Sequence, residues 1–164
     1  MAQERYWKEL YLLKVHINYV EAHLLDAEVY DRRIKMFMAI VSSSSIGAWA
    51  IWKELSFLWA AIIAISQVIA AISPHLPFKE RLKTYSSILH ELEEIFIQME
   101  AKWHDIASGK CDEDEINKAR TNLRLQKHKL LKKHLSGSVI PDDTKKAEKA
   151  EALALEYFST FYPA

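Results

Sequence analysis

Two apolar stretches dominate the pattern of hydrophobic and polar positions along the chain. Residues 36–52 and 55–78 contain no Asp, Glu, Lys or Arg, and only Lys53 and Glu54 separate them. As helices rising 1.5 Å per residue, these 17 and 24 residues reach about 25 and 36 Å, against about 30 Å of bilayer hydrocarbon. The pattern predicts a two-helix transmembrane hairpin over residues 34–78, with a very short turn at Lys53 and Glu54.

Basic residues flank both ends of the predicted hairpin. They are Arg32, Arg33 and Lys35 before it, and Lys79, Arg81 and Lys83 after it. Because loops rich in Lys and Arg stay on the cytoplasmic side, we expect both termini to face the cytoplasm. The alternative is a soluble bundle with a buried hairpin. Its helices should keep a polar stripe, and these two segments show almost none.

Apolar residues recur at spacings of three and four on either side of the hairpin. The first series is Tyr6, Leu10, Leu13, Ile17, Val20, Leu24 and Ala27, and the second is Leu82, Tyr85, Leu89, Leu92, Phe96, Met99, Trp103 and Ile106. Such spacing places each series on one face of a helix, as in a coiled coil. No Pro or Gly precedes Gly47, so we predict one long helix that runs into the first span. We expect the two arms to pack as an antiparallel pair.

Two further helices are predicted near the C-terminus. Acidic residues at 112–115 suit the first turn of a helix that runs to about residue 135, since the helix dipole favours negative charge there. Pro141 opens a last helix that ends near Phe161. With only 3 Gly and 4 Pro in 164 residues, the fold class is all-α. The predicted organisation is an N-terminal arm (1–33), the membrane hairpin (34–78) and C-terminal helices (79–164).

Four consecutive serines lie inside the first apolar stretch. Ala39, Ser43 and Gly47 form a ladder of small residues, expected to pack against an alanine face of the second span. That face comprises Ala60, Ala64, Gln67 and Ala71. Successive helical residues are about 100° apart, so some serines must point elsewhere, where each can bond the carbonyl four residues back. The other hypothesis is a pore or subunit interface formed by Ser42, Ser43, Ser45, Gly47 and Gln67.

A strongly basic segment follows at residues 118–133. Its candidate contacts are Arg120, Arg124, Lys127 and Lys132. The simplest interpretation is a solvated helix face; the alternative is contact with anionic lipid or a phosphate-bearing signal. We do not expect nucleic-acid binding, because the formal net charge is zero and the segment lacks aromatic residues for base stacking.

The chain shows no motif of an enzyme or a metal protein. Its seven His residues form neither a Glu-x-x-His pair nor a His-Glu-x-x-His motif, and Cys111 is the only cysteine. Three scattered glycines do not build a phosphate-binding loop. We therefore predict no catalytic residues, no metal and no cofactor.

The order of helical arm, close pair of spans and second helical arm resembles the SLATT family of bacterial two-transmembrane proteins. The resemblance covers roughly residues 5–135 and is carried by Tyr30 to Ile34, by the stretch from Ser66 to Arg81 with Pro74 and Pro77, and by Lys83 to Leu92. It implies a homo-oligomeric inner-membrane effector of abortive antiviral defence. An upstream nucleotide-signalling enzyme or a cyclic nucleotide would trigger it to disrupt the membrane. A membrane-anchored scaffold and a soluble oligomer joined through the hairpin are the alternatives.

Overall fold

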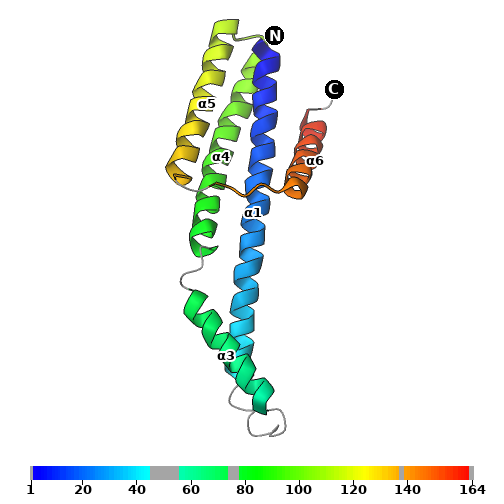
Figure 1. Cartoon of the computed structure of the whole chain (residues 1–164). Helices are drawn as coiled ribbons and strands as arrows, with labels where there is room; N and C mark the ends of the chain where they lie inside the picture. The colour runs from blue at the N-terminus through cyan, green and yellow to red at the C-terminus, as the bar shows by residue number, and fades with distance from the viewer. Residues whose placement is uncertain (1, 45–55, 74–77, 137–138, 163–164) are drawn as a thin grey trace. The chain divides into compact units, whose positions relative to one another are not determined.

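The computed structural model describes residues 2–44, 56–73, 78–136 and 139–162. All regular structure in these ranges is helical, which confirms the predicted all-α class. The helices are α1 (Ala2–Ser44), α3 (Ser56–Ile72), α4 (Phe78–Ala107), α5 (Glu113–His134) and α6 (Thr144–Phe161), with the labels of Figure 1. The predicted turn at Lys53 and Glu54 lies outside the described residues.

These helices form two compact units along the chain. Unit 1 comprises Met1–Leu25 with Lys83–Ala164, and unit 2 comprises Asp26–Leu82. α1 is a single helix of 43 residues, as predicted, and supplies residues to both units.

The core of unit 1 is built on the antiparallel pair of α1 and α4. The first heptad series is buried there from Tyr6 to Val20, and in the second Tyr85, Leu89, Leu92, Phe96, Met99 and Ile106 are buried. Tyr6 donates a hydrogen bond to the Met99 carbonyl (3.0 Å), and the Gln3 amide donates to the Ile106 carbonyl (2.7 Å). The two arms therefore pack along their predicted seams.

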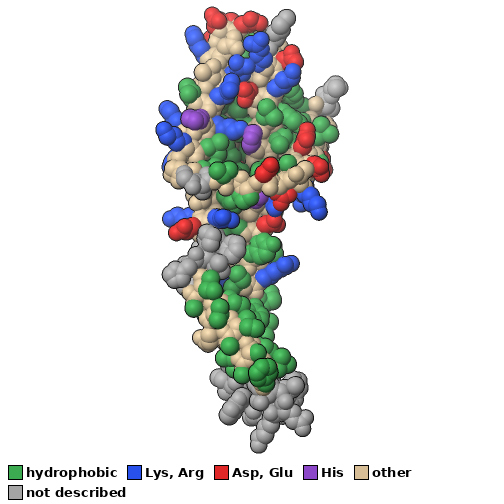
Figure 2. Space-filling model, in the orientation of Figure 1, with side chains coloured by type: hydrophobic (Ala, Val, Ile, Leu, Met, Phe, Trp, Pro, Cys, Tyr) green, Lys and Arg blue, Asp and Glu red, His purple; other side chains and the backbone are tan. Residues whose placement is uncertain are grey.

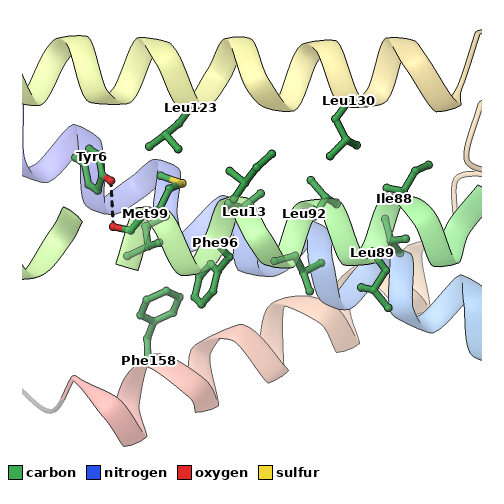
Figure 3. Close-up of a cluster of buried hydrophobic side chains, with 14 of the residues drawn as sticks. Tyr6, Leu13, Ile88, Leu89, Leu92, Phe96, Met99, Leu123, Leu130 and Phe158 are labelled. Carbon is green, nitrogen blue, oxygen red and sulfur yellow. Dashed lines mark hydrogen bonds between the residues drawn. The ribbon is translucent and has the colours of Figure 1, made fainter. Parts of the chain in front are cut away.

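α5 covers one side of this pair. Gly109, with φ of 71°, follows α4 in the left-handed conformation that glycine adopts readily. Asp112 then caps α5: its carboxylate accepts from the Glu115 amide (2.7 Å), and its own amide donates to the Glu115 carboxylate (3.1 Å). Such a reciprocal cap satisfies two amides that lack helical partners. The buried residues of this helix are Ile116, Leu123 and Leu130, which are seven residues apart. Figure 3 shows Leu123 and Leu130 on the side that faces the pair.

α6 lies on the opposite side of the pair from α5 (Figure 3). It begins after Asp143, whose carboxylate accepts from the Lys146 amide (3.1 Å). Its buried residues are Ala150, Ala154 and Phe158, a narrow stripe four residues apart. Buried Asn18 of α1 donates to the Ala150 carbonyl (3.1 Å), so a polar contact as well as the stripe fixes the position of α6 on unit 1.

Candidate functional site

Unit 2 leaves an unusual number of large apolar side chains exposed. They are Val29, Tyr30, Met36, Phe37 and Ile40 of α1, and Phe57, Leu58, Ile65, Val68 and Ile72 of α3. α3 carries no charged residue between Ser56 and Ile72. Figure 2 shows the consequence: hydrophobic side chains cover α3, whereas charged side chains are spread over the helices of unit 1. Exposed apolar surface of this extent is the strongest candidate for a functional surface.

The face of α3 that turns inward is not the predicted one. Ser66 is buried within unit 2, and its hydroxyl donates to the Ile63 carbonyl (2.7 Å). Ile62, Ile69 and Ser73 extend this inward stripe as half-buried residues. The predicted packing face, Ala60, Ala64, Gln67 and Ala71, is exposed instead. The expectation that the alanine face closes the hairpin was therefore wrong.

The serine block is described only in part. Ser42 is exposed, and its hydroxyl donates to the Met38 carbonyl four residues earlier (2.8 Å), which is the back-bond predicted for serines in this segment. Ser43 lies in α1, but its side chain is outside the described set, as are Ser45 and Gly47 entirely. The proposal that these serines line a pore stays a prediction.

The basic residues that flank the two apolar stretches are mostly exposed. Arg32, Arg33, Arg81 and Lys83 lie on the surface, and Lys35 forms an ion pair with Asp31 one helical turn earlier. The side chain of Lys79 is outside the described set. Each described member can therefore contact solvent or a headgroup.

The four candidate anion contacts on α5 do not share one surface. Arg120 and Lys127 fall on the buried stripe of this helix, each four residues after a buried Ile116 or Leu123. Arg124 lies at the edge of that stripe, where its Nε atom is 3.6 Å from the Glu9 carboxylate of α1. Lys132 points away from it and is exposed. The structure thus brings three of the four residues together and separates Lys132 from them.

Lys127 is the most constrained of these residues. Its Nζ atom lies 2.9 Å from Nδ1 of His16 on α1, and the same Nδ1 lies 2.7 Å from the Leu12 carbonyl. Burial lowers the pKa of Lys127, since desolvation disfavours its charged form. Burial, and then the nearby Lys127 charge, lower the pKa of His16, although much of that side chain is exposed. Together these contacts join α5 to α1.

The cavity beside this contact is small. It is lined by Glu9, Leu13, Ile95, Met99, Leu123, Arg124 and Lys127 and measures about 20 Å³. That volume holds one water molecule, not a phosphate-bearing ligand. Anion contact at the exposed ends of Arg124 and Lys132 stays a prediction.

A second charged contact joins α5 to α4. The Glu91 carboxylate accepts from Lys133 Nζ (2.8 Å) and lies 2.7 Å from His134 Nε2. The hydrogen bond from Lys133, followed by that from His134, lowers the pKa of Glu91. Much of the basic charge on α5 thus serves the bundle. Sequence reasoning missed this because it considered only a solvated helix face or contact with an anionic ligand or lipid.

The described ranges contain neither a spanning helix nor a metal-binding cluster. No helix there combines the length and the apolar character needed to cross a membrane. No group of three or more His, Cys, Asp or Glu side chains in those ranges could hold a metal ion.

Comparison of the chain with protein-family models, with curated proteins and with solved structures found no match.

Proposed function

We propose that this protein is a membrane effector whose unit 2 inserts into the bilayer, self-associates and makes the membrane permeable. The observation that carries the proposal is the exposed apolar coat of unit 2. Burying a large apolar side chain stabilises a protein by about 1.5–3 kcal/mol, so ten such side chains in water are a substantial cost. Lipid or another protein surface would remove it.

The distribution of charge favours lipid as the covering phase. In the sequence, uncharged residues continue through 55–78, beyond both ends of α3. Exposed Arg32 and Arg33 precede the apolar part of α1, and Arg81 and Lys83 follow the second stretch. This arrangement matches a hairpin with both termini on the cytoplasmic side, because basic residues are retained there. A purely protein-covered hairpin gives no reason for basic residues at both ends.

The outer face of α3 supports self-association. Ala60, Ala64, Gln67 and Ala71 lie within about 60° of one another around the helix, at 100° per residue, and all four are exposed. In lipid, small residues let helices approach closely, and an amide such as Gln67 needs a hydrogen-bonding partner. A second copy of α3 offers both a small surface and an amide. We therefore assign the assembly contact to this face.

The resemblance to the SLATT family supplies the biological setting of the proposal. An upstream nucleotide-signalling protein would trigger assembly during phage infection, and loss of the membrane barrier would stop the infected cell. Exposed basic side chains of α5, such as Lys132, are candidates to receive an anionic trigger.

The test has two readouts in cells that express the full chain with its genomic neighbours. Membrane association is measured by flotation after alkaline extraction, and membrane potential by a voltage-sensitive dye. We expect wild type to float and to depolarise cells after phage addition. Ala64→Leu and Gln67→Leu should float but lose depolarisation, because a bulky or apolar group blocks assembly.

Ile65→Leu is the matched control, since it keeps side-chain volume on the neighbouring exposed surface of α3. It should behave as wild type. If the wild-type protein does not float with the membranes, membrane insertion is refuted and a soluble oligomer is favoured. Wild type that floats but never depolarises triggered cells would refute the effector and leave an anchored scaffold.

A further inference from the structure

A cleft in unit 2 combines charges of both signs with apolar groups. It is lined by Glu28, Asp31, Arg32, Lys35 and Met36 of α1 and by Leu82 of α4, and its volume is about 620 Å³. The lining carries two carboxylates and two cations, so its formal charge is zero. Met36, one of the lining residues, is the position at which the uncharged part of α1 begins.

Two of the four charged residues form an ion pair with each other, and the other two do not. Asp31 and Lys35 form an ion pair across one helical turn. Glu28 and Arg32 have the same spacing and could pair in the same way. Neither has an ion-pair partner among the residues that the structure describes, and both are exposed to solvent. Glu28 and Arg32 therefore offer an acceptor and a donor, one helical turn apart, to a ligand in the cleft.

We propose that this cleft binds the phosphoethanolamine headgroup of a bilayer lipid. Arg32 would hold the phosphate, because a guanidinium donates two parallel hydrogen bonds to phosphate oxygens. Glu28 would accept from the primary ammonium, which the headgroup joins to the phosphate through two carbons. Met36 and Leu82 supply apolar contact for the glycerol and the first acyl carbons.

The neutral lining separates this ligand from other lipid classes. An anionic headgroup meets Arg32 but also the two carboxylates, which repel it. A phosphocholine headgroup has the right charges, but its trimethylammonium has no N–H to donate to Glu28. The inference rests on the proposed membrane insertion, since only an inserted unit 2 brings the cleft to the depth of headgroups.

The experiment measures which lipids the full chain retains. The protein is purified in mild detergent, given an equimolar mixture of phosphatidylethanolamine and phosphatidylcholine, and analysed by native mass spectrometry. We expect wild type to retain phosphatidylethanolamine over phosphatidylcholine by about threefold, the size of one charged contact at an exposed site. Arg32→Gln should reduce retention of both lipids. Glu28→Leu should keep lipid but bring the ratio to about one, because it removes the acceptor for the ammonium.

Arg5→Gln is the matched control, because Arg5 is an exposed arginine of the same helix that belongs to unit 1 and does not line the cleft. It should retain lipid as wild type does. A wild-type ratio near one, or equal losses in Arg32→Gln and Arg5→Gln, would overturn the assignment.

Soluble phosphoethanolamine distinguishes the source of the headgroup. At a concentration equal to that of the lipid it should not displace the lipid, because it lacks the part that contacts Met36 and Leu82. Full displacement would assign the cleft to a soluble zwitterion instead. Flotation with vesicles is measured in parallel: protein that floats without headgroup preference refutes only this inference, whereas protein that does not float refutes the proposed function.

Discussion

Units 1 and 2 use similar residues in opposite ways. In unit 1, leucines and isoleucines at heptad spacing are almost completely inaccessible, and Leu92 is 1% exposed. In unit 2, Val68 is 57% and Phe57 is 88% exposed, although α3 is the more apolar helix. The amount of apolar sequence therefore does not decide burial within the chain. Burial depends on whether polar residues occupy the opposite face of the helix, because only then does the helix have one defined apolar face to pack against a neighbour.

The largest expected effect is on the free energy of unfolding, which should fall far more for a substitution in the core of unit 1 than for one on α3. Leu92→Ala should lower the free energy of unfolding by about 2–5 kcal/mol, because it opens a cavity in the core of unit 1. Ile65→Ala on α3 should change it by less than about 0.5 kcal/mol, because that side chain is already exposed. Chemical denaturation of the full chain in mild detergent measures both. Equal losses would mean that α3 is packed in a core and that the contrast between the units is wrong.

The second prediction concerns membrane affinity. Val68→Lys should weaken partition into vesicles by about 2.5–3.5 kcal/mol, the cost of a lysine near the centre of an inserted helix. Leu125→Lys on α5 is the matched control, since Leu125 is 52% exposed but belongs to unit 1. It should partition as wild type. Vesicle flotation at several lipid concentrations gives the affinities, and equal losses for the two variants would locate the lipid contact outside unit 2.

The packing of unit 1 was predictable because its pattern has a direction. Two arms with heptad series that are joined by a hairpin pack most simply as an antiparallel pair. The hydrogen bond from the Tyr6 hydroxyl to the Met99 carbonyl is part of this pairing. The orientation of α3 was not predictable in the same way. Every residue from Ser56 to Ile72 is uncharged, so periodicity could not separate the Ser66 face from the Gln67 face. Small residues suggested close packing but not with which neighbour.

The role of Lys127 was missed although a signal was present. Ile116, Leu123 and Leu130 are seven residues apart, and Lys127 lies on the same stripe, between the last two. A lysine in that position must reach a polar partner across the interface. Counting positive charges along α5 hid this, whereas projecting them on the helix would have separated Lys127 from Lys132.

A smaller effect is expected at the contact between α1 and α4. Tyr6→Phe should lower the free energy of unfolding by about 0.5–1.5 kcal/mol, because it removes the hydrogen bond from the hydroxyl to the Met99 carbonyl. Tyr11→Phe is the control, since it keeps the ring contact between residue 11 and Phe158 and should cost less than Tyr6→Phe. Denaturation curves for both variants measure the difference. A smaller loss for Tyr6→Phe than for Tyr11→Phe would contradict the role given to the buried hydroxyl.

The smallest expected effect is the pH dependence of unit 1. The folded state lowers the pKa of His16 below its usual value of about 6.5, so the unfolded chain binds a proton more readily there. Stability from this group is therefore present above the unfolded pKa and is lost as the pH falls through the folded one. His16→Gln should flatten the decline in melting temperature that wild type shows between about pH 7 and pH 5.

His128→Gln is the control for that measurement, because His128 is exposed on α5 and has the same chemistry. Its pH profile should follow wild type. Lys127→Met sharpens the result further: it removes the cation that lies 2.9 Å from His16, so part of the cause of the lowered pKa disappears. The decline should then be smaller and end at a higher pH without vanishing, since burial remains. An unchanged profile in both His16→Gln and Lys127→Met would show that the contact between α1 and α5 is not linked to protonation.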